Sequence, residues 1–198
     1  MIEPRPGSRA EHKARTRAAI RAAALELISK QGYQATTVAQ IAERAGVSHT
    51  TLFRYFDSKE QVLVTDDLGE ARQRMLDAVP PGLSHFDLAR RMLTDLFEVA
   101  RDDPWASDPQ RLHLLRTEPV LRMAYQLEAD RVMLEAVEFI ADYTGTPADA
   151  LELRVFVAAL SGVMMMIAEQ AAEPDEATLA EFLAAVDLLE QGLPLVTR

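Results

Sequence analysis

Apolar residues recur at intervals of three and four along most of the chain, and a two-residue alternation is nowhere sustained. Intervals of three and four place side chains on one face of an α-helix, whereas alternation is typical of half-buried β-strands. Most glycines and prolines fall between the periodic segments, where they interrupt helices. The pattern therefore predicts an all-α fold of about nine helices.

The first periodic segment predicts a helix over residues 9–30. It is preceded by residues 1–8, which hold two prolines and one glycine and are expected to form a flexible arm. Ile20, Ala24 and Ile28 share one face of the helix, and Gly32 is expected to end it.

Capping residues divide the following segment into shorter helices. Thr37 begins a capping box before a short helix that ends at Gly46, and Ser48 caps another that runs to Phe56. Ser58 opens a fourth helix that is expected to reach about residue 79.

Pro80 and Pro81 form the strongest helix breaker in the chain. Beyond them, Pro147 is expected at a first helical position, where its missing N–H is not needed. The helices expected in this part are 84–101, a short one from 103, 119–143, 147–172 and 175–192.

Charge is distributed unevenly along a chain whose formal net charge is −10. Residues 1–60 hold ten Lys and Arg against six Asp and Glu, whereas the remaining residues hold 11 basic and 25 acidic side chains. This asymmetry predicts a basic head that meets a polyanion and an acidic body that does not.

The 198-residue chain contains no cysteine, which excludes disulfides, thiolate metal sites and a cysteine nucleophile. Its first residues lead into a charged stretch instead of an apolar one, so we expect no secretory signal. The most apolar run, residues 155–168, is shorter than a bilayer-spanning helix. We therefore expect a cytoplasmic protein that does not enter the membrane.

Two short helices joined by a tight turn at 45–48 predict a helix-turn-helix. A helix as short as the second one has little independent stability, so Leu52 and Phe56 are expected to hold it against the core. Its other positions carry side chains that bind bases or phosphates, namely His49, Thr50, Thr51, Arg54 and Tyr55. The pattern indicates binding to double-stranded DNA.

The ordered set of residues in this region resembles the DNA-binding domain of TetR-type transcriptional repressors. The resemblance covers roughly residues 9–65 and rests on three runs: Thr37 to Ser48, Thr51 to Phe56, and Asp57 to Glu60. The family often has glycine where Thr50 stands and tyrosine where Phe53 stands. Neither departure threatens the expected fold.

The resemblance implies roles for eight residues. Ser48, His49, Thr50 and Thr51 would approach base edges in the major groove, whereas Thr37, Arg54, Tyr55 and Lys59 would contact phosphates. Simpler alternatives stay open, because Thr37 and Ser48 cap helices in any protein, Tyr55 can pack, and a single arginine is usually a solvated charge. Phe53 and Phe56 are expected in the core.

No catalytic or metal-binding pattern is visible beyond residue 81. His85 and His113 lie far apart and lack the spacing of paired ligands on a helix, and no glycine-rich phosphate loop is present. The sequence therefore predicts neither an enzyme nor a bound cofactor or metal.

The segment 155–167 is hydrophobic almost all round, so the helix that carries it is expected to be buried on several sides. In TetR-type proteins the last two long helices form a four-helix dimer bundle, and the resemblance implies the same here. A two-fold dimer would present two recognition helices to a pseudo-palindromic operator. The expected interface residues are Val157, Ser161, Gly162, Met165, Leu183 and Val186.

The resemblance also implies an effector cavity among the helices of the body. Each residue expected to line it has an ordinary core position as its alternative. The stretch 111–122 resembles TetR-type members that answer to fatty acyl-CoA. Its arginines, Arg111, Arg116 and Arg122, are candidates to meet an anionic head group, and the equal alternative is that they are solvated. The expected lining is Phe86, Leu93, Phe97, Trp105, Leu112, Met123, Leu127, Met133, Phe156 and Met164.

These patterns predict a ligand-responsive repressor with a DNA-binding domain at 9–56 and an effector-binding and dimerisation domain at 57–198. It would bind operator DNA as a homodimer and leave it when a small hydrophobic effector, acyl-CoA-like, binds. The alternative is a helical carrier of small molecules with a vestigial DNA-binding head, which the apolar body and the acidic net charge favour. The sequence does not separate a repressor from an activator.

Overall fold

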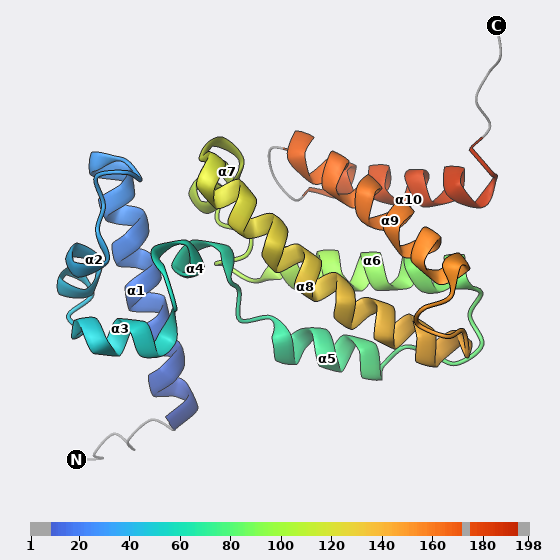
Figure 1. Cartoon of the computed structure of the whole chain (residues 1–198), viewed down its shortest axis with the longest axis horizontal. Helices are drawn as coiled ribbons and strands as arrows, with labels where there is room; N and C mark the ends of the chain where they lie inside the picture. Colours follow the sequence, from blue (N-terminus) through green and yellow to red (C-terminus); the bar gives the residue numbers. More distant parts are fainter. Residues whose placement is uncertain (1–8, 172–174, 194–198) are drawn as a thin grey trace, which may run out of the picture. The chain divides into compact units, whose positions relative to one another are not determined.

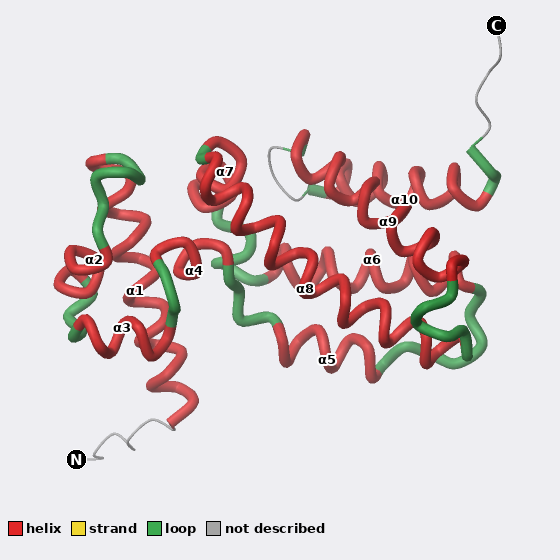
Figure 2. Tube along the Cα trace, in the orientation of Figure 1, coloured by secondary structure: helices red, strands yellow, loops and turns green. Residues whose placement is uncertain are grey.

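The computed structural model describes residues 9–171 and 175–193. Within these ranges the chain forms ten α-helices and no strand, which confirms the all-α prediction (Figures 1 and 2). The predicted arm, residues 1–8, lies outside the described residues. The helices are α1 (Arg9–Gln31), α2 (Val38–Arg44), α3 (His49–Tyr55), α4 (Lys59–Val64), α5 (Gly69–Asp77), α6 (His85–Asp102), α7 (Pro109–Thr117), α8 (Pro119–Thr144), α9 (Leu151–Gln170) and α10 (Glu176–Glu190).

The prediction of one continuous helix over residues 58–79 was wrong. After α4 the chain turns extended at Thr65, and α5 begins only at Gly69. The carboxylate of Asp66 fixes the break, because it accepts hydrogen bonds from the Leu68 N–H at 3.0 Å and from Arg72 Nη1 at 3.1 Å. Aspartate competes in this way with the helical hydrogen-bond ladder, a local effect that the apolar periodicity does not report.

Two further helix starts lie later than predicted. Pro147 belongs to a turn in which the Ala150 N–H donates to its carbonyl at 2.9 Å, and α9 follows from Leu151. Near residue 103, the Asp103 carboxylate accepts from the N–H groups of Trp105 and Ala106, at 3.0 and 2.7 Å, and α7 starts after this turn. Asp and Pro open turns as readily as helices, so they do not locate the first helical residue.

The chain divides into two compact units. The first comprises the described part of Met1–Thr65 together with Thr117–Tyr125, and the second comprises Asp66–Arg116 with the described part of Gln126–Arg198. The first residues of α8 therefore belong to the first unit and the remainder of that helix to the second. The sequence-based boundary after residue 56 instead separates α4 from α1, with which α4 is in contact.

The core of the first unit is built on α1. Ile20, Ala24 and Ile28 are buried, as their shared face predicted. α1 contacts α2 and α4, and α2 contacts α3. Ile41 of α2 and Leu52 of α3 are both fully buried. Helices of seven residues are marginal alone in water, so this burial is what keeps α2 and α3 folded.

The core of the second unit runs along α6 in three apolar clusters, centred on Leu88, Leu93 and Phe97. α6 packs against α10, and α10 packs against α9. Arg90 of α6 adds ion pairs to α10, with Asp187 at 2.7 Å and with Glu190.

The 20-residue helix α9 is long and apolar enough to cross a bilayer by length and composition alone, with a mean hydropathy of 1.8. The argument that its apolar run is too short was therefore wrong, because the helix extends that run at both ends. Only 22% of the apolar window is buried within the described chain. Much of this helix is thus left uncovered by the described residues.

Candidate nucleic-acid interface

The turn between α2 and α3 has the geometry that ends a helix sharply. Gly46 has a φ of +68°, the left-handed region that glycine adopts without steric cost. Its N–H donates to the Glu43 carbonyl at 3.1 Å, and the Val47 N–H donates to the Ala42 carbonyl at 3.0 Å. This pair of bonds is the Schellman arrangement, and it fixes the direction in which α3 leaves α2.

Thr37 and Ser48 both act as N-caps, which confirms the predicted starts of α2 and α3. Thr37 forms a complete capping box with Gln40. Ser48 Oγ accepts from the Thr51 N–H at 3.0 Å and lies 2.8 Å from Thr51 Oγ1. The hydroxyls of Thr37, Ser48 and Thr51 are therefore held in place by contacts within the chain.

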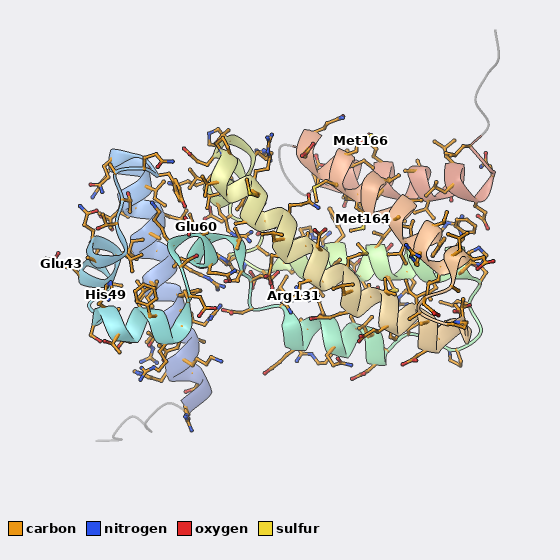
Figure 3. All side chains as sticks on the ribbon, in the orientation of Figure 1. Glu43, His49, Glu60, Arg131, Met164 and Met166 are labelled. Atoms are coloured by element: carbon orange, nitrogen blue, oxygen red, sulfur yellow. The ribbon has the colours of Figure 1, made fainter. Side chains whose placement is uncertain are left out.

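One face of α3 is left exposed, and it carries His49, Thr50, Phe53 and Arg54. Figure 3 shows His49 at the start of α3, beside α2 with its Glu43. The expectation that Phe53 belongs to the core was wrong, because its side chain is 41% exposed and its ring packs edge-on against His49, with centroids 4.8 Å apart. An aromatic ring thus joins the polar residues of this face.

The opposite face of α3 is anchored by side chains of α1. Leu52 and Phe56 are buried, as predicted. Arg17 Nη1 donates to the Tyr55 carbonyl at 3.0 Å, and its guanidinium lies 4.3 Å from the centre of the Phe56 ring. A cation at the C-terminal end of a helix also interacts favourably with the helix dipole.

Arg17 and Arg21 were counted in the sequence only among the basic residues of the head. They were not expected to hold the fold together. Arg21 is only 5% exposed and its Nη2 donates to the Thr65 carbonyl at 2.9 Å, at the end of α4. The signal was present in the spacing, since Arg17 lies three residues before Ile20 and Arg21 three residues before Ala24 on the buried face of α1.

Lys59 lies against the loop between α1 and α2. Its Nζ donates to the carbonyls of Tyr33 and Thr36, both at 2.9 Å, and lies 3.9 Å from the centre of the Tyr33 ring. These bonds occupy two of the three donors of the ammonium group. The residue that the resemblance assigns to phosphate therefore holds the loop that leads into Thr37.

Glu60 completes this contact, because the Tyr33 hydroxyl donates to its carboxylate. Burial raises the pKa of Tyr33, and the hydrogen bond to Glu60 raises it further. Burial alone would also raise the pKa of Glu60, but hydrogen bonds from Tyr33, from its own backbone N–H and from Ser58 outweigh burial and lower it. The ionised carboxylate is thus the form that the fold selects.

Other basic residues of the first unit differ in how free they are to meet an anion. Glu26 pairs with Lys30 at 2.6 Å and with Arg44 at 2.5 Å, and these two hydrogen bonds lower its pKa. By contrast, Lys13 and Arg15 near the start of α1 are exposed and form no ion pair with another described residue. The beginning of α1 therefore offers more available positive charge than α2.

The residues expected to line an effector cavity come together only in part, since Phe86, Leu93, Phe156 and Met164 share one apolar cluster to which the others do not belong. Leu93 and Phe97 belong to buried core clusters, while Met133 packs on a third. The side chains of Met123 and Leu127 are exposed, at 69% and 67%. The remaining members are half-buried, and two of them, Phe86 and Phe156, line one pocket. Met133 is half-buried as well, so the full half-buried set is Phe86, Trp105, Leu112, Met133, Phe156 and Met164.

Two of the three arginines proposed for an anionic head group are engaged within the chain. Arg111 is buried, donates to the Ala106 carbonyl at 3.2 Å and lies 5.3 Å from the Trp105 ring centre. Arg116 donates to the Ala171 carbonyl at 2.6 Å. Arg122 is exposed.

The expected dimer residues also fall into two groups. Val157 and Val186 are buried in the core of their own chain, 5% and 1% exposed, so a second copy cannot reach them. Ser161, Met165 and Leu183 are half-buried, and Gly162 is exposed. The all-round hydrophobicity of α9 did not indicate which side faces its own core.

Comparison with known families identifies both parts of the chain. Residues 20–64 match the model of the bacterial regulatory proteins of the tetR family, and residues 83–194 match the model of the MftR C-terminal domain. The chain belongs to the tetR family. This regulator therefore carries the family's helix-turn-helix in α2 and α3, as the sequence predicted.

Curated relatives agree with this assignment. The HTH-type transcriptional regulator TcmR of Streptomyces glaucescens is 30% identical over 200 residues, spanning 95% of this chain and 88% of the relative. The HTH-type transcriptional regulator RutR of Escherichia coli is 32% identical over 117 residues, 58% of this chain and 55% of the relative. The protein is thus a DNA-binding transcriptional regulator of a non-enzymatic family.

Solved structures show the same fold. FadR of Thermus thermophilus, described as a repressor in complex with lauroyl-CoA, aligns over 92% of this chain and 96% of its own, with a TM-score of 0.50 and 25% identity. FadR of Bacillus halodurans, a fatty acid degradation regulator, aligns over 91% and 97%, with a TM-score of 0.52 and 18% identity.

The contact between Tyr33 and Glu60 predicts a pH-dependent stability. Because the folded pKa of Glu60 lies below its ordinary value of 4.5, the stabilisation is present above that pH and is lost as the pH falls through the folded pKa. Tyr33→Phe removes the donor, so its destabilisation relative to wild type should be largest near neutral pH and shrink below about pH 4.5. Urea unfolding of both proteins across this range measures the difference.

Tyr125→Phe provides the matched control, because Tyr125 is half-buried in the same unit and forms no described hydrogen bond to a carboxylate. Its difference from wild type should not vary with pH. A Tyr33→Phe difference that stays constant from neutral to acidic pH would contradict the account of Glu60.

Proposed function

We propose that α3 is the recognition helix and reads an operator in the major groove. The observation that carries this proposal is the division of α3 into two faces, one buried through Leu52 and one exposed through His49, Thr50 and Arg54. An α-helix with polar side chains on an exposed face fits the major groove, where each base pair presents a distinct pattern of donors and acceptors.

Within this face the proposal assigns different roles to different residues. Ser48, His49, Thr50 and Thr51 lie on the first turn of α3 or at its cap, the part of a recognition helix that approaches base edges. Arg54, Tyr55 and Thr37 are proposed to contact phosphates. Lys59 is proposed as a positioning residue, since its bonds to the loop carbonyls set the entry to Thr37.

The exposed start of α1 adds to the phosphate-binding surface. Lys13 and Arg15 are exposed on the same unit as α3, and a sequence-independent attraction to phosphates supplies much of the affinity of DNA-binding proteins. Residues 61–198, which carry the excess of acidic side chains, are not proposed to attract phosphates. The basic head alone is therefore proposed to meet DNA, in the cytoplasm of a bacterium.

We also propose that the regulator is a homodimer joined through α9 and α10. Leu151, Val155, Ala158, Gly162 and Met166 are exposed and recur every three or four residues on the side of α9 opposite its buried residues. We call this set the α9 stripe. α10 likewise exposes the small residues Ala180 and Ala184, together with Leu188. A second copy would cover these surfaces and place two recognition helices on a pseudo-palindrome.

An effector is proposed to release the regulator from DNA, so that the protein acts as a repressor. Support comes from the likeness to FadR of Thermus thermophilus, whose structure contains lauroyl-CoA. A ligand that binds only the conformation with low affinity for the operator shifts the population toward that conformation. A small hydrophobic effector fits the apolar composition of the second unit.

Arg54→Ala should weaken operator binding and lower its salt dependence. If each Arg54 neutralises one phosphate, its loss reduces the slope of log K against log salt by about one per protomer. Affinity for a bound duplex, measured by fluorescence anisotropy at several salt concentrations, tests the change. Arg74→Ala is the control, because Arg74 is an exposed arginine of the second unit. A slope for Arg54→Ala equal to that of Arg74→Ala would contradict the assignment.

Ala158→Glu should convert the dimer to a monomer by placing a charge in the middle of the α9 stripe, where a partner would desolvate it. Ala168→Glu introduces the same side chain at another exposed position of α9 that lies outside the stripe, and it should leave the dimer intact. Sedimentation velocity of the three proteins at micromolar concentration reports the oligomeric state. Two variants with the same state would count against the α9 stripe as the interface.

A further inference from the structure

A cavity of about 440 Å³ lies in the second unit, lined by residues of four helices. Its walls come from the start of α6, the end of α8, the first half of α9 and Leu189 near the end of α10. The volume is within the range of sites that hold small organic molecules. Such sites are lined mostly by apolar side chains, with a few polar groups at defined positions.

An aromatic cluster forms one wall of this cavity. Phe86 and Phe156 meet edge to face with ring centres 5.4 Å apart, and His85 packs on both, at 4.5 and 5.3 Å. Leu153 and Ile140 continue the apolar surface. Such a wall offers ring faces and edges to a flat aromatic ligand.

Glu152 is the one acidic residue among the described lining residues, which include His85 but no arginine or lysine. Glu152 is exposed at the rim and has no ion-pair partner in the described part of the chain. Thr144 and Thr146 supply hydroxyls nearby. A carboxylate beside aromatic rings favours a cation, which gains both a charge-assisted hydrogen bond and cation–π attraction.

The helix ends at the cavity do not reverse this preference. The positive ends of α6 and α9 would attract an anion, but each already holds a carboxylate in its first turn. Asp87 of α6 is paired with Arg90 at 2.9 Å and does not line the cavity, whereas Glu152 of α9 does line it. An anionic ligand would meet the carboxylate of Glu152, with no arginine or lysine among the described lining residues. The long phosphorylated head of an acyl-CoA is therefore poorly matched to this site.

We propose that this cavity binds a hydrophobic amine, a ligand with a flat aromatic body and a protonated nitrogen. The aromatic body lies against Phe86 and Phe156, and the ammonium group faces Glu152. This inference deepens the proposed function, on which the ligand's role as effector rests. Val155 lines the cavity and also belongs to the α9 stripe. A ligand in the cavity would therefore contact a residue of the surface proposed for the second copy.

Direct binding to the full-length protein without DNA tests the proposal. Naphthylethylamine and naphthylacetate carry the same ring system with opposite charge, and lauroyl-CoA represents the anionic alternative. Isothermal titration calorimetry should show the amine binding roughly tenfold more tightly than the acetate, the effect of one charge-assisted contact. Acetate or lauroyl-CoA binding more tightly than the amine would overturn the proposal.

Two variants locate the site. Glu152→Gln, a change of equal size at an exposed position, should bring the affinity for the amine to within about twofold of that for the acetate. Glu169→Gln, an exposed acidic position of α9 outside the cavity, should keep the full preference. Phe156→Leu should weaken both probes, because it removes the ring against which they lie. An unchanged preference in Glu152→Gln overturns the assignment.

The outcome is separable from that of operator binding. Ligand-free wild type is assayed for DNA binding in parallel, and the calorimetric experiment contains no DNA. Failure to bind any DNA with the amine preference intact would overturn the regulatory role and leave the cavity's chemistry standing. Operator binding without the preference would do the reverse.

Discussion

Burial of one side of a seven-residue helix is the constraint on which the DNA-binding surface depends. α3 is too short to be helical alone, and it is held by Leu52, by Phe56 and by the guanidinium of Arg17 on the Tyr55 carbonyl. These contacts fix both the position and the rotation of α3. Because the rotation is fixed, His49, Thr50 and Arg54 necessarily share the exposed face. A second set of contacts, from Lys59 and Glu60 to the α1–α2 loop, sets the position of α2 in the same way.

The parts of this arrangement that sequence reasoning recovered are those governed by local chemistry. The caps at Thr37 and Ser48, the left-handed turn at Gly46 and the inward side of α3 all follow from residue type and spacing, and all are present. The contacts that sequence reasoning missed are those made by the charged ends of long side chains, whose direction the sequence does not give. Lys59 and Arg17 look like surface cations in a sequence, but their ammonium and guanidinium groups reach backbone carbonyls of other segments. Phe53, an aromatic residue, is exposed because its position on α3 faces outward.

The second unit shows the same limit on a larger scale. α9 is apolar on all sides, so periodicity cannot separate the side that packs on α6 and α10 from the side that remains open. Val157 and Val186 turned out to be core, and Ala158 and Gly162 turned out to be exposed. Family membership explains why a helical body accompanies the DNA-binding head, but the chemistry of its cavity is set by the side chains that line it. The acidic rim at Glu152 distinguishes it from a site built for an anion.

The central claim is that the two-faced α3 helix reads a specific operator as part of a two-fold dimer. Selection of bound duplexes from a random DNA pool by the purified regulator tests this most directly, because it assumes neither the operator nor the effector. The account predicts enrichment of an inverted repeat whose half-sites are about one helical turn, or a multiple of it, apart. Recovery of no preferred sequence by folded, dimeric protein would contradict it and favour a carrier of small molecules whose DNA-binding head no longer functions.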